Sequence, residues 1–185
     1  MHHKFNYLIQ LWDRSKSGPT DSLFRHFFMK ISLISIGVTR EPYLKEGMAL
    51  YEKRIKHYIA FETICLNEPR NAKNQPETLQ RETQGKLLLS ALTKVDHPVL
   101  LDVNAKQYDS HGFAEFIQLA MNKGIRNLGF VIGGPYGFAE QVYQTVPESL
   151  SLSKMTFSHQ LVRLVFLEQL YRAFTIIKGE PYHHA

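Results

Sequence analysis

The sequence predicts an α/β protein with a mostly parallel sheet that carries helices on both faces. Short apolar segments typical of buried strands alternate with longer amphipathic segments typical of helices. No internal repeat or low-complexity tract interrupts this alternation. At 185 residues, with 44% hydrophobic and 21% charged residues, the chain has the length and composition of one globular domain.

Five segments have the pattern of strands. The first, residues 31–37, is apolar apart from two serines, which is typical of a strand buried on both faces of a parallel sheet. The other four are residues 59–66, 98–101, 127–132 and 149–152.

Five further segments, lying between or after these strands, have the pattern of helices. Pro42 fits the first turn of the earliest helix. Ser110 and Ser158 are expected to cap the third and the last, and Gly85 is a mild flaw in the second. The expected ranges are 42–57, 77–92, 111–123, 139–145 and, for a last helix that stops before Gly179, about 159–177.

Residues 1–28 differ from the rest because neither a helical nor a strand period persists in them. One interpretation is a functional basic arm. The favoured one is an extension, disordered or read from an upstream start codon, with the domain spanning residues 29–185.

Composition narrows the class of protein. The net charge of +5 suits an acidic partner such as RNA, although many proteins without such a partner are as basic. Cys65, the only cysteine, excludes an intrachain disulfide and a cysteine-rich zinc site, and its apolar segment predicts a buried, inert thiol. The chain shows no membrane span, signal peptide or cluster of metal ligands, so we expect a cytoplasmic protein without a membrane partner or a metal.

Two loops near the C-terminus have the features of a ligand site. The first, residues 133–137 (GGPYG), follows a buried strand, where glycines let a backbone approach a ligand closely; a tight turn is the alternative. It matches neither a Walker loop nor G-x-G-x-x-G. The second, residues 151–157, offers hydroxyls from Ser153 and Thr156 between apolar side chains, although a strand and a helix cap would also explain it.

The last predicted helix adds charged side chains and leads into an aromatic tail. His159 and Arg163 are four residues apart and are expected to share a helical face, and Glu168 and Arg172 have the spacing of an ion pair. The C-terminal tail, residues 179–185, contains Tyr182, His183 and His184. Such a tail is either disordered or docked into a site, including the site of a partner subunit.

The segments VIGGPYGF, SLSLSKMTFSHQLVRLVFLEQLYRAF and GEPYHH together closely resemble the ribosomal RNA large subunit methyltransferase H family, which belongs to the SPOUT methyltransferases. The resemblance extends over residues 29–185 and includes KISLISIG and LLDVNAK. It implies a C-terminal trefoil knot and a homodimer. It also implies transfer of a methyl group from S-adenosylmethionine to N-3 of a pseudouridine in large-subunit ribosomal RNA. We expect the assembled ribosome to be the substrate, with the large subunit or free RNA as the alternatives.

The resemblance also implies which residues contact the cofactor. All but one lie in the two loops; the exception, Leu101, would otherwise be assigned to the core. The residues are Leu101, Gly133, Leu152, Ser153, Lys154, Met155, Thr156 and Phe157.

The same chemistry gives candidate catalytic residues. His159 or His183 would remove the N-3 proton, since histidine titrates near neutral pH. Arg163 or Arg172 would hold a phosphate or the carbonyl oxygens of the base, and Tyr182 would stack on the target base.

Two other classes of function explain the sequence less completely. A non-catalytic knotted protein that binds RNA or assists ribosome assembly would explain the charge and the tail but would leave both loops without a ligand. A nucleotide-binding α/β protein of another chemistry would need a phosphate-loop lysine or a ribose-binding acid at the usual spacing, and neither is present.

Overall fold

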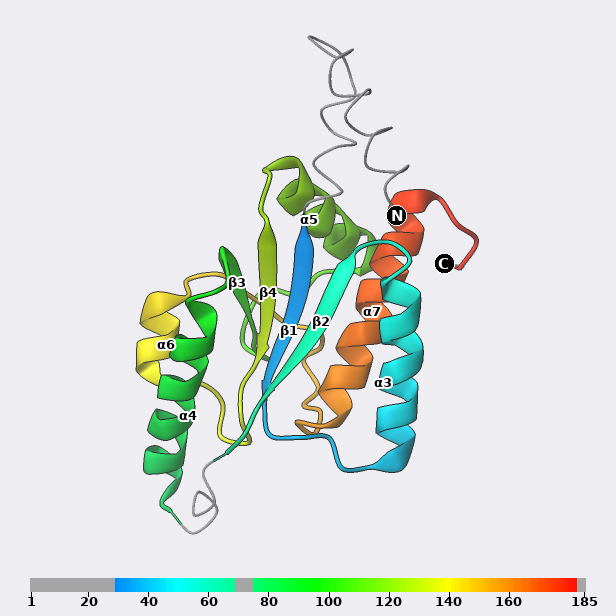
Figure 1. Ribbon diagram of the computed structural model, residues 1–185. Coiled ribbons are helices and arrows are strands. Elements are labelled where there is room, and N and C mark those ends of the chain that lie inside the picture. The colour runs from blue at the N-terminus through cyan, green and yellow to red at the C-terminus, as the bar shows by residue number, and fades with distance from the viewer. Residues whose placement is uncertain (1–28, 69–74, 183–185) are drawn as a thin grey trace, which may run out of the picture.

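The computed structural model describes residues 29–68 and 75–182. Its centre is a sheet of five strands in the order β2-β1-β4-β3-β5, and every paired strand is parallel (Figure 1). The predicted α/β class with a parallel sheet is therefore confirmed. The strands are β1 (Lys30–Ile36), β2 (Ala60–Leu66), β3 (His97–Leu101), β4 (Asn127–Ile132) and β5 (Ser149–Leu150).

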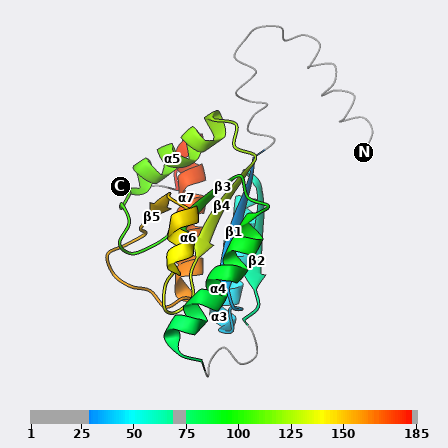
Figure 2. The ribbon, with the colours of Figure 1, turned by 90° about the vertical axis from the view of Figure 1, so that its left-hand side faces the viewer.

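Helices cover both faces of the sheet, as predicted. One face carries α3 (Pro42–Ile55), α5 (Ser110–Asn122) and α7 (Leu161–Lys178), and α7 packs against both of the others. The opposite face carries α4 (Glu77–Leu92) and α6 (Glu140–Thr145). Figure 1 shows the strands between α4 and α6 on one side and α3 and α7 on the other, and Figure 2 looks onto the face that carries α4 and α6.

Each face of the sheet has its own hydrophobic core because successive side chains of a strand point in opposite directions. In β1, Ile31 and Leu33 pack with the layer of α3, α5 and α7, whereas Ile34 and Ile36 pack with α4 and α6. All four are at most 2% exposed. Burial on both faces explains why β1 has apolar residues that point to both sides of the sheet, with Ser32 and Ser35 buried among them.

Two predicted helix caps were wrong. The cap of α5 is Asp109, whose Oδ1 accepts a hydrogen bond from the Gly112 amide at 2.7 Å, while Ser110 is already helical. Helix α7 begins only at Leu161, although the Ser158 hydroxyl still accepts the Leu161 amide at 3.2 Å. His159 therefore lies in the turn before α7 and does not share a helical face with Arg163.

Two further expectations change with the observed packing. Cys65 is exposed, not buried, because β2 is an edge strand of the sheet. Gly85, expected to be a flaw in α4, has a packing role: a Cβ atom there would lie 2.8 Å from Cβ of Ala139 and 3.0 Å from Nε2 of Gln141. Glycine thus allows α4 to approach the start of α6 closely.

The remaining helix ends lie close to their predicted positions. Helix α7 is followed by its C-cap Gly179, whose φ of 67° is in the left-handed region, and the Glu180 amide donates to the Thr175 carbonyl at 2.9 Å.

None of the helices in residues 29–68 and 75–182 combines the length and apolar character that a membrane crossing requires. The trefoil knot stays a prediction, and the predicted N-terminal extension lies outside the described residues.

Candidate active site

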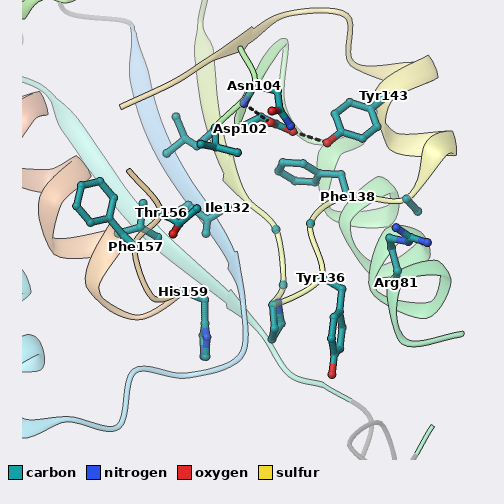
Figure 3. A pocket seen from close by; sticks show the side chains of 18 of the residues that line it. Arg81, Asp102, Asn104, Ile132, Tyr136, Phe138, Tyr143, Thr156, Phe157 and His159 are labelled. Carbon is teal, nitrogen blue, oxygen red and sulfur yellow. Dashed lines mark hydrogen bonds between the residues drawn. The ribbon is translucent and has the colours of Figure 1, made fainter. Parts of the chain in front are cut away.

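A pocket of about 980 Å³ lies at the carboxyl edge of the sheet (Figure 3). Its walls come from the end of β3, the loop after β4, the segment before α7, and the facing sides of α4 and α6. Open α/β sheets bind ligands at this edge. The two loops selected from the sequence thus open onto one cavity.

The glycine loop folds back on itself at the floor of this pocket. The Gly137 amide donates to the Gly134 carbonyl at 3.1 Å, which makes the loop a tight turn. A Cβ atom at Gly133 would lie 3.2 Å from the backbone of Gly137. A Cβ atom at Gly134 would lie 2.1 Å from Oε1 of Gln84, so any larger residue there would have to displace that side chain. The glycine loop is therefore a tight turn and also forms part of the pocket wall.

Gln84 joins this loop to the end of β2. Its side chain is 2% exposed, and its Nε2 donates to Oε1 of Glu68 at 2.7 Å. An ionised carboxylate can only accept hydrogen bonds, so this contact fixes which end of the amide faces Glu68. The Gln84 oxygen is therefore turned away from Glu68 and has no hydrogen-bond partner among the described residues.

The segment before α7 is shaped by its own serine hydroxyls. The Ser151 hydroxyl donates to the Ser153 carbonyl at 2.9 Å, and the Ser153 hydroxyl accepts the Met155 amide at 2.9 Å. The side chains of Met155 and Phe157 remain 76% and 37% exposed. A hydrogen-bonded loop thus presents apolar side chains next to the cavity.

Seven of the eight residues expected to contact a cofactor line the pocket. They are Leu101, Gly133, Leu152, Ser153, Met155, Thr156 and Phe157. Lys154, the eighth, is exposed and is not among the lining residues.

His159 also lines the pocket, in the turn between the second loop and α7. Partial burial of the imidazole lowers its pKa, and the positive charge of Arg163 lowers the pKa further. The Glu68 carboxylate opposes this shift. The imidazole is therefore neutral near pH 7 and has a free nitrogen lone pair that can take a proton.

Arg163 is placed differently from the expectation that it holds a phosphate. Its side chain is fully buried, with Nη2 donating to the Ile36 carbonyl at 2.7 Å and Nη1 donating to the Thr39 hydroxyl at 2.9 Å. The guanidinium thus ties the start of α7 to the segment after β1. The Gln160 side chain adds to this tie by accepting the Arg40 amide at 2.6 Å. Arg163 positions the turn that carries His159 and does not reach the pocket.

A polar and aromatic cluster lies at the opposite end of α7. Arg172 pairs with Glu168 at 2.6 Å, as their spacing predicted, and its guanidinium lies 5.0 Å from the centroid of the Tyr182 ring. The Tyr182 hydroxyl lies 3.3 Å from Glu168 and 3.4 Å from the Tyr51 hydroxyl. Burial, and secondly the contact with Tyr51, raises the pKa of Tyr182 well above its ordinary value. His183 lies outside the described residues.

The pocket and this cluster are separated by the length of a helix. Helix α7 has 18 residues, which corresponds to about 27 Å at the usual rise. His159 precedes its first residue and Tyr182 follows its last, as the course of α7 toward the C-terminus in Figure 1 shows. Within one chain, Tyr182 therefore lies far from the pocket.

Sequence reasoning missed several polar residues of the pocket wall. Asp102 and Asn104 follow the end of β3, and Tyr143 comes from α6 (Figure 3). The sequence feature that could have indicated them is an acidic residue, Asp102, directly after a buried strand.

In the part of the chain that the structure describes, histidine, cysteine and acidic side chains form no group that could hold a metal ion.

Comparison with known families agrees with this geometry. A family model described as "Predicted SPOUT methyltransferase" matches residues 29–183. The chain therefore belongs to the SPOUT methyltransferase family. A solved structure of a probable methyltransferase from Bordetella pertussis Tohama I has a similar fold, with a TM-score of 0.51 at 13% identity, covering 83% of this chain and 98% of that one.

Closer relatives narrow the family further. Ribosomal RNA large subunit methyltransferase H of Christiangramia forsetii is 51% identical over 156 residues, which is 84% of this chain and 99% of that protein. The protein of the same name from Flavobacterium psychrophilum is 50% identical over the same share of both chains. Within the SPOUT methyltransferases, the chain belongs with the family of that name.

Proposed function

We propose that this protein transfers a methyl group from S-adenosylmethionine to N-3 of a pseudouridine in large-subunit ribosomal RNA, in the cytoplasm and on the assembled ribosome. The single observation that carries the proposal is the pocket at the carboxyl edge of the sheet. Three separate segments bring seven candidate cofactor residues around it. The names and the identity of the relatives support the choice of acceptor.

The pocket has the size and lining that an adenosyl cofactor needs. A volume of about 980 Å³ is at the upper end of the range for small-molecule sites. Leu101, Ile132 and Leu152 give an apolar wall for a flat ring, and Asp102, Ser153 and Thr156 bring hydrogen-bonding groups. When bound, the sulfonium of S-adenosylmethionine supplies the methyl group. The protein has to hold the acceptor nitrogen in line with it, and alignment is the larger part of the rate gain.

The acceptor nitrogen is a poor nucleophile while it carries its proton. His159 is neutral near pH 7, lies at the pocket and is suited to take that proton as the nitrogen–carbon bond forms. A general base of this kind contributes a factor of about 10²–10⁴. Arg163 supports this step by holding the turn that carries His159.

The remaining substrate contacts belong to the cluster at the far end of α7. Arg172 is suited to a phosphate or to the carbonyl oxygens of the base, and Tyr182 is suited to stacking on the base. Because about 27 Å of helix separates this cluster from the pocket of the same chain, we propose a homodimer. In it, the C-terminal tail of one protomer, including His183, completes the pocket of the other.

Two measurements test this function. S-Adenosylhomocysteine should raise the melting temperature of the protein, since binding to the folded state stabilises it. Labelled methyl groups should then pass from S-adenosylmethionine to one position of large-subunit RNA in 70S ribosomes that lack this modification, and not to naked RNA. Binding of the cofactor without transfer to either acceptor would leave a non-catalytic RNA-binding role.

The tail has a test of its own. Replacing Tyr182 and His183 together by alanine should abolish turnover, while the shift in melting temperature with S-adenosylhomocysteine stays as in the wild type. Full turnover in the double variant would show that the tail is not part of the site.

A further inference from the structure

Asp102 is the acidic residue that directly follows β3, and it lines the pocket. Leu101 is paired with Ile132 across the sheet, so Asp102 lies where these two strands end, next to the start of the glycine loop. The proposed function counts Asp102 among the hydrogen-bonding groups of the pocket but assigns no ligand group to its carboxylate.

The carboxylate of Asp102 is held on both of its oxygens (Figure 3). Oδ1 accepts the Asn104 amide at 2.8 Å, and Oδ2 accepts a hydrogen bond from the Tyr143 hydroxyl. Burial, followed by this contact with Asp102, raises the pKa of Tyr143 to about 12, so the hydroxyl keeps its proton and donates. Each carboxylate oxygen can accept a second hydrogen bond. The carboxylate is thus fixed in orientation with acceptor capacity left over.

The surroundings decide what kind of donor fits. Leu101 and Ile132 form an apolar wall beside the carboxylate, and the ring of Phe138 meets that of Tyr143 edge to face at 5.7 Å between centroids. A flat heterocycle can lie against such a wall. In a nucleoside, the heterocycle is attached to a ribose. The two neighbouring hydroxyls of this ribose can both donate and match a carboxylate that only accepts.

We infer that Asp102 receives the 2′- and 3′-hydroxyls of the ribose of the adenosyl cofactor, with Tyr143 and Asn104 holding its carboxylate in place. The inference rests on the proposed function and deepens it, because it assigns the residue that selects a ribonucleoside. It also explains why no ribose-binding acid was evident from the spacing of the sequence: the acid follows a different strand from the one that leads into the glycine loop.

The test measures dissociation constants for S-adenosylhomocysteine and for its 2′-deoxy and 3′-deoxy analogues by isothermal titration calorimetry. The wild type should bind at least one deoxy analogue about tenfold or more weakly, as expected for losing a hydrogen bond to a charged group. In both Asp102→Asn and Asp102→Ala, the parent compound should bind more weakly; the ratio between parent and analogue should decrease in Asp102→Asn, whose amide oxygen still accepts, and fall to about one in Asp102→Ala. Glu140→Gln, an acidic residue of the same pocket wall, is the matched control and should keep the wild-type ratio.

The ratio of the dissociation constants for the parent compound and its deoxy analogues distinguishes a ribose contact of Asp102 from a purely structural role. A variant that only distorts the pocket weakens all three ligands equally and keeps the ratio, which would overturn the inference. Equal binding of all three ligands by the wild type would overturn it too, while leaving the proposed cofactor in place. If the wild type binds none of them, the proposed function falls together with the inference.

Discussion

The two edges of the sheet are built in opposite ways. At the amino edge, polar side chains satisfy one another: Glu62 accepts hydrogen bonds from Lys30 at 2.7 Å and from Ser32 at 2.9 Å. Asn127 there donates to the Lys94 carbonyl at 2.6 Å. At the carboxyl edge, Oε1 of Gln84 and Nε of Arg163 are buried without a hydrogen-bond partner among the described residues.

This difference marks the carboxyl edge as the part of the sheet that carries the site. Buried polar groups are almost always paired, and exceptions concentrate at functional sites. The carboxyl edge also has the glycine loop, the pocket and the turn with His159. We therefore expect substitutions at this edge to have large effects on activity, ligand binding or stability, and substitutions at the amino edge to change stability only slightly.

The largest effect is expected at His159. His159→Ala should lower single-turnover methyl transfer about 10²–10⁴-fold at neutral pH, because the base is lost. In the wild type, the rate should fall as pH drops through the pKa of His159, which lies below the ordinary value of 6.5 because burial disfavours the charged form. The variant should lose this acidic limb of the pH profile. A profile that the substitution leaves unchanged would assign the proton to another group.

Arg163 should show the largest effect on stability. Arg163→Ala removes the donors to Ile36 and Thr39 and leaves a cavity, so the free energy of unfolding in urea should fall by about 3–5 kcal/mol. Arg172→Ala is the matched control, because its partly exposed ion pair with Glu168 should contribute only about 1 kcal/mol or less. Similar losses for the two arginines would contradict a structural role that is particular to Arg163.

Two glycines of one loop give a finer test. Gly134→Ala places a methyl group 2.1 Å from Oε1 of Gln84 and should cost about 1–3 kcal/mol of stability through overcrowding. In Gly137→Ala, the added Cβ would have no atom within 4 Å, so no clash is expected. The residue would keep a φ of +75°, which should cost about 1–2 kcal/mol of backbone strain.

A second substitution separates the two mechanisms. Shortening the neighbour with Gln84→Ala removes this clash and should recover stability that the Gly134→Ala protein has lost, measured by urea unfolding. It should not help Gly137→Ala. Rescue of neither variant would show that the contact between Gln84 and Gly134 does not set the shape of the loop.

The smallest effect is expected at the amino edge. The hydrogen bond from Lys30, more than any other contact, lowers the pKa of Glu62. The carboxylate therefore contributes stability above its unfolded pKa of about 4.3 and loses it as pH falls through the lower folded value. Both side chains are about 40% exposed, at 39% and 42%, so Glu62→Gln should cost less than about 1 kcal/mol at pH 7. Urea unfolding at several pH values, with exposed Glu115→Gln as the control, checks both the size and the sign.

The fold was largely predictable because burial on both faces leaves a pattern in the chain. The strand over Asn127–Ile132 and the helix over Glu77–Leu92 were predicted with the observed ends. The exposure of Cys65 was not predictable, because periodicity does not reveal which strand lies at the edge of a sheet.

The site was predictable in its loops but not in its contacts. Glycines and hydroxyl residues after strands mark such loops by composition alone. The burial of Arg163 and the pairing of Asp102 with Tyr143 depend on contacts between segments far apart in the sequence. The distance between Tyr182 and the pocket depends in turn on where α7 begins.

The central claim is that the pocket of one protomer and the tail of another form one site, and mixed dimers test it most directly. Thr156→Trp, a change at an exposed residue of the pocket wall, should block the cofactor without disturbing the core. The second variant carries Tyr182→Ala and His183→Ala. Each protein alone should be inactive on ribosomes.

Refolding the two variants together at equal amounts should restore about a quarter of wild-type methyl transfer, because half of the dimers are mixed and each mixed dimer has one complete site. Activity no greater than the sum of the two separate variants, with mixed dimers demonstrated by two affinity tags, would contradict the account.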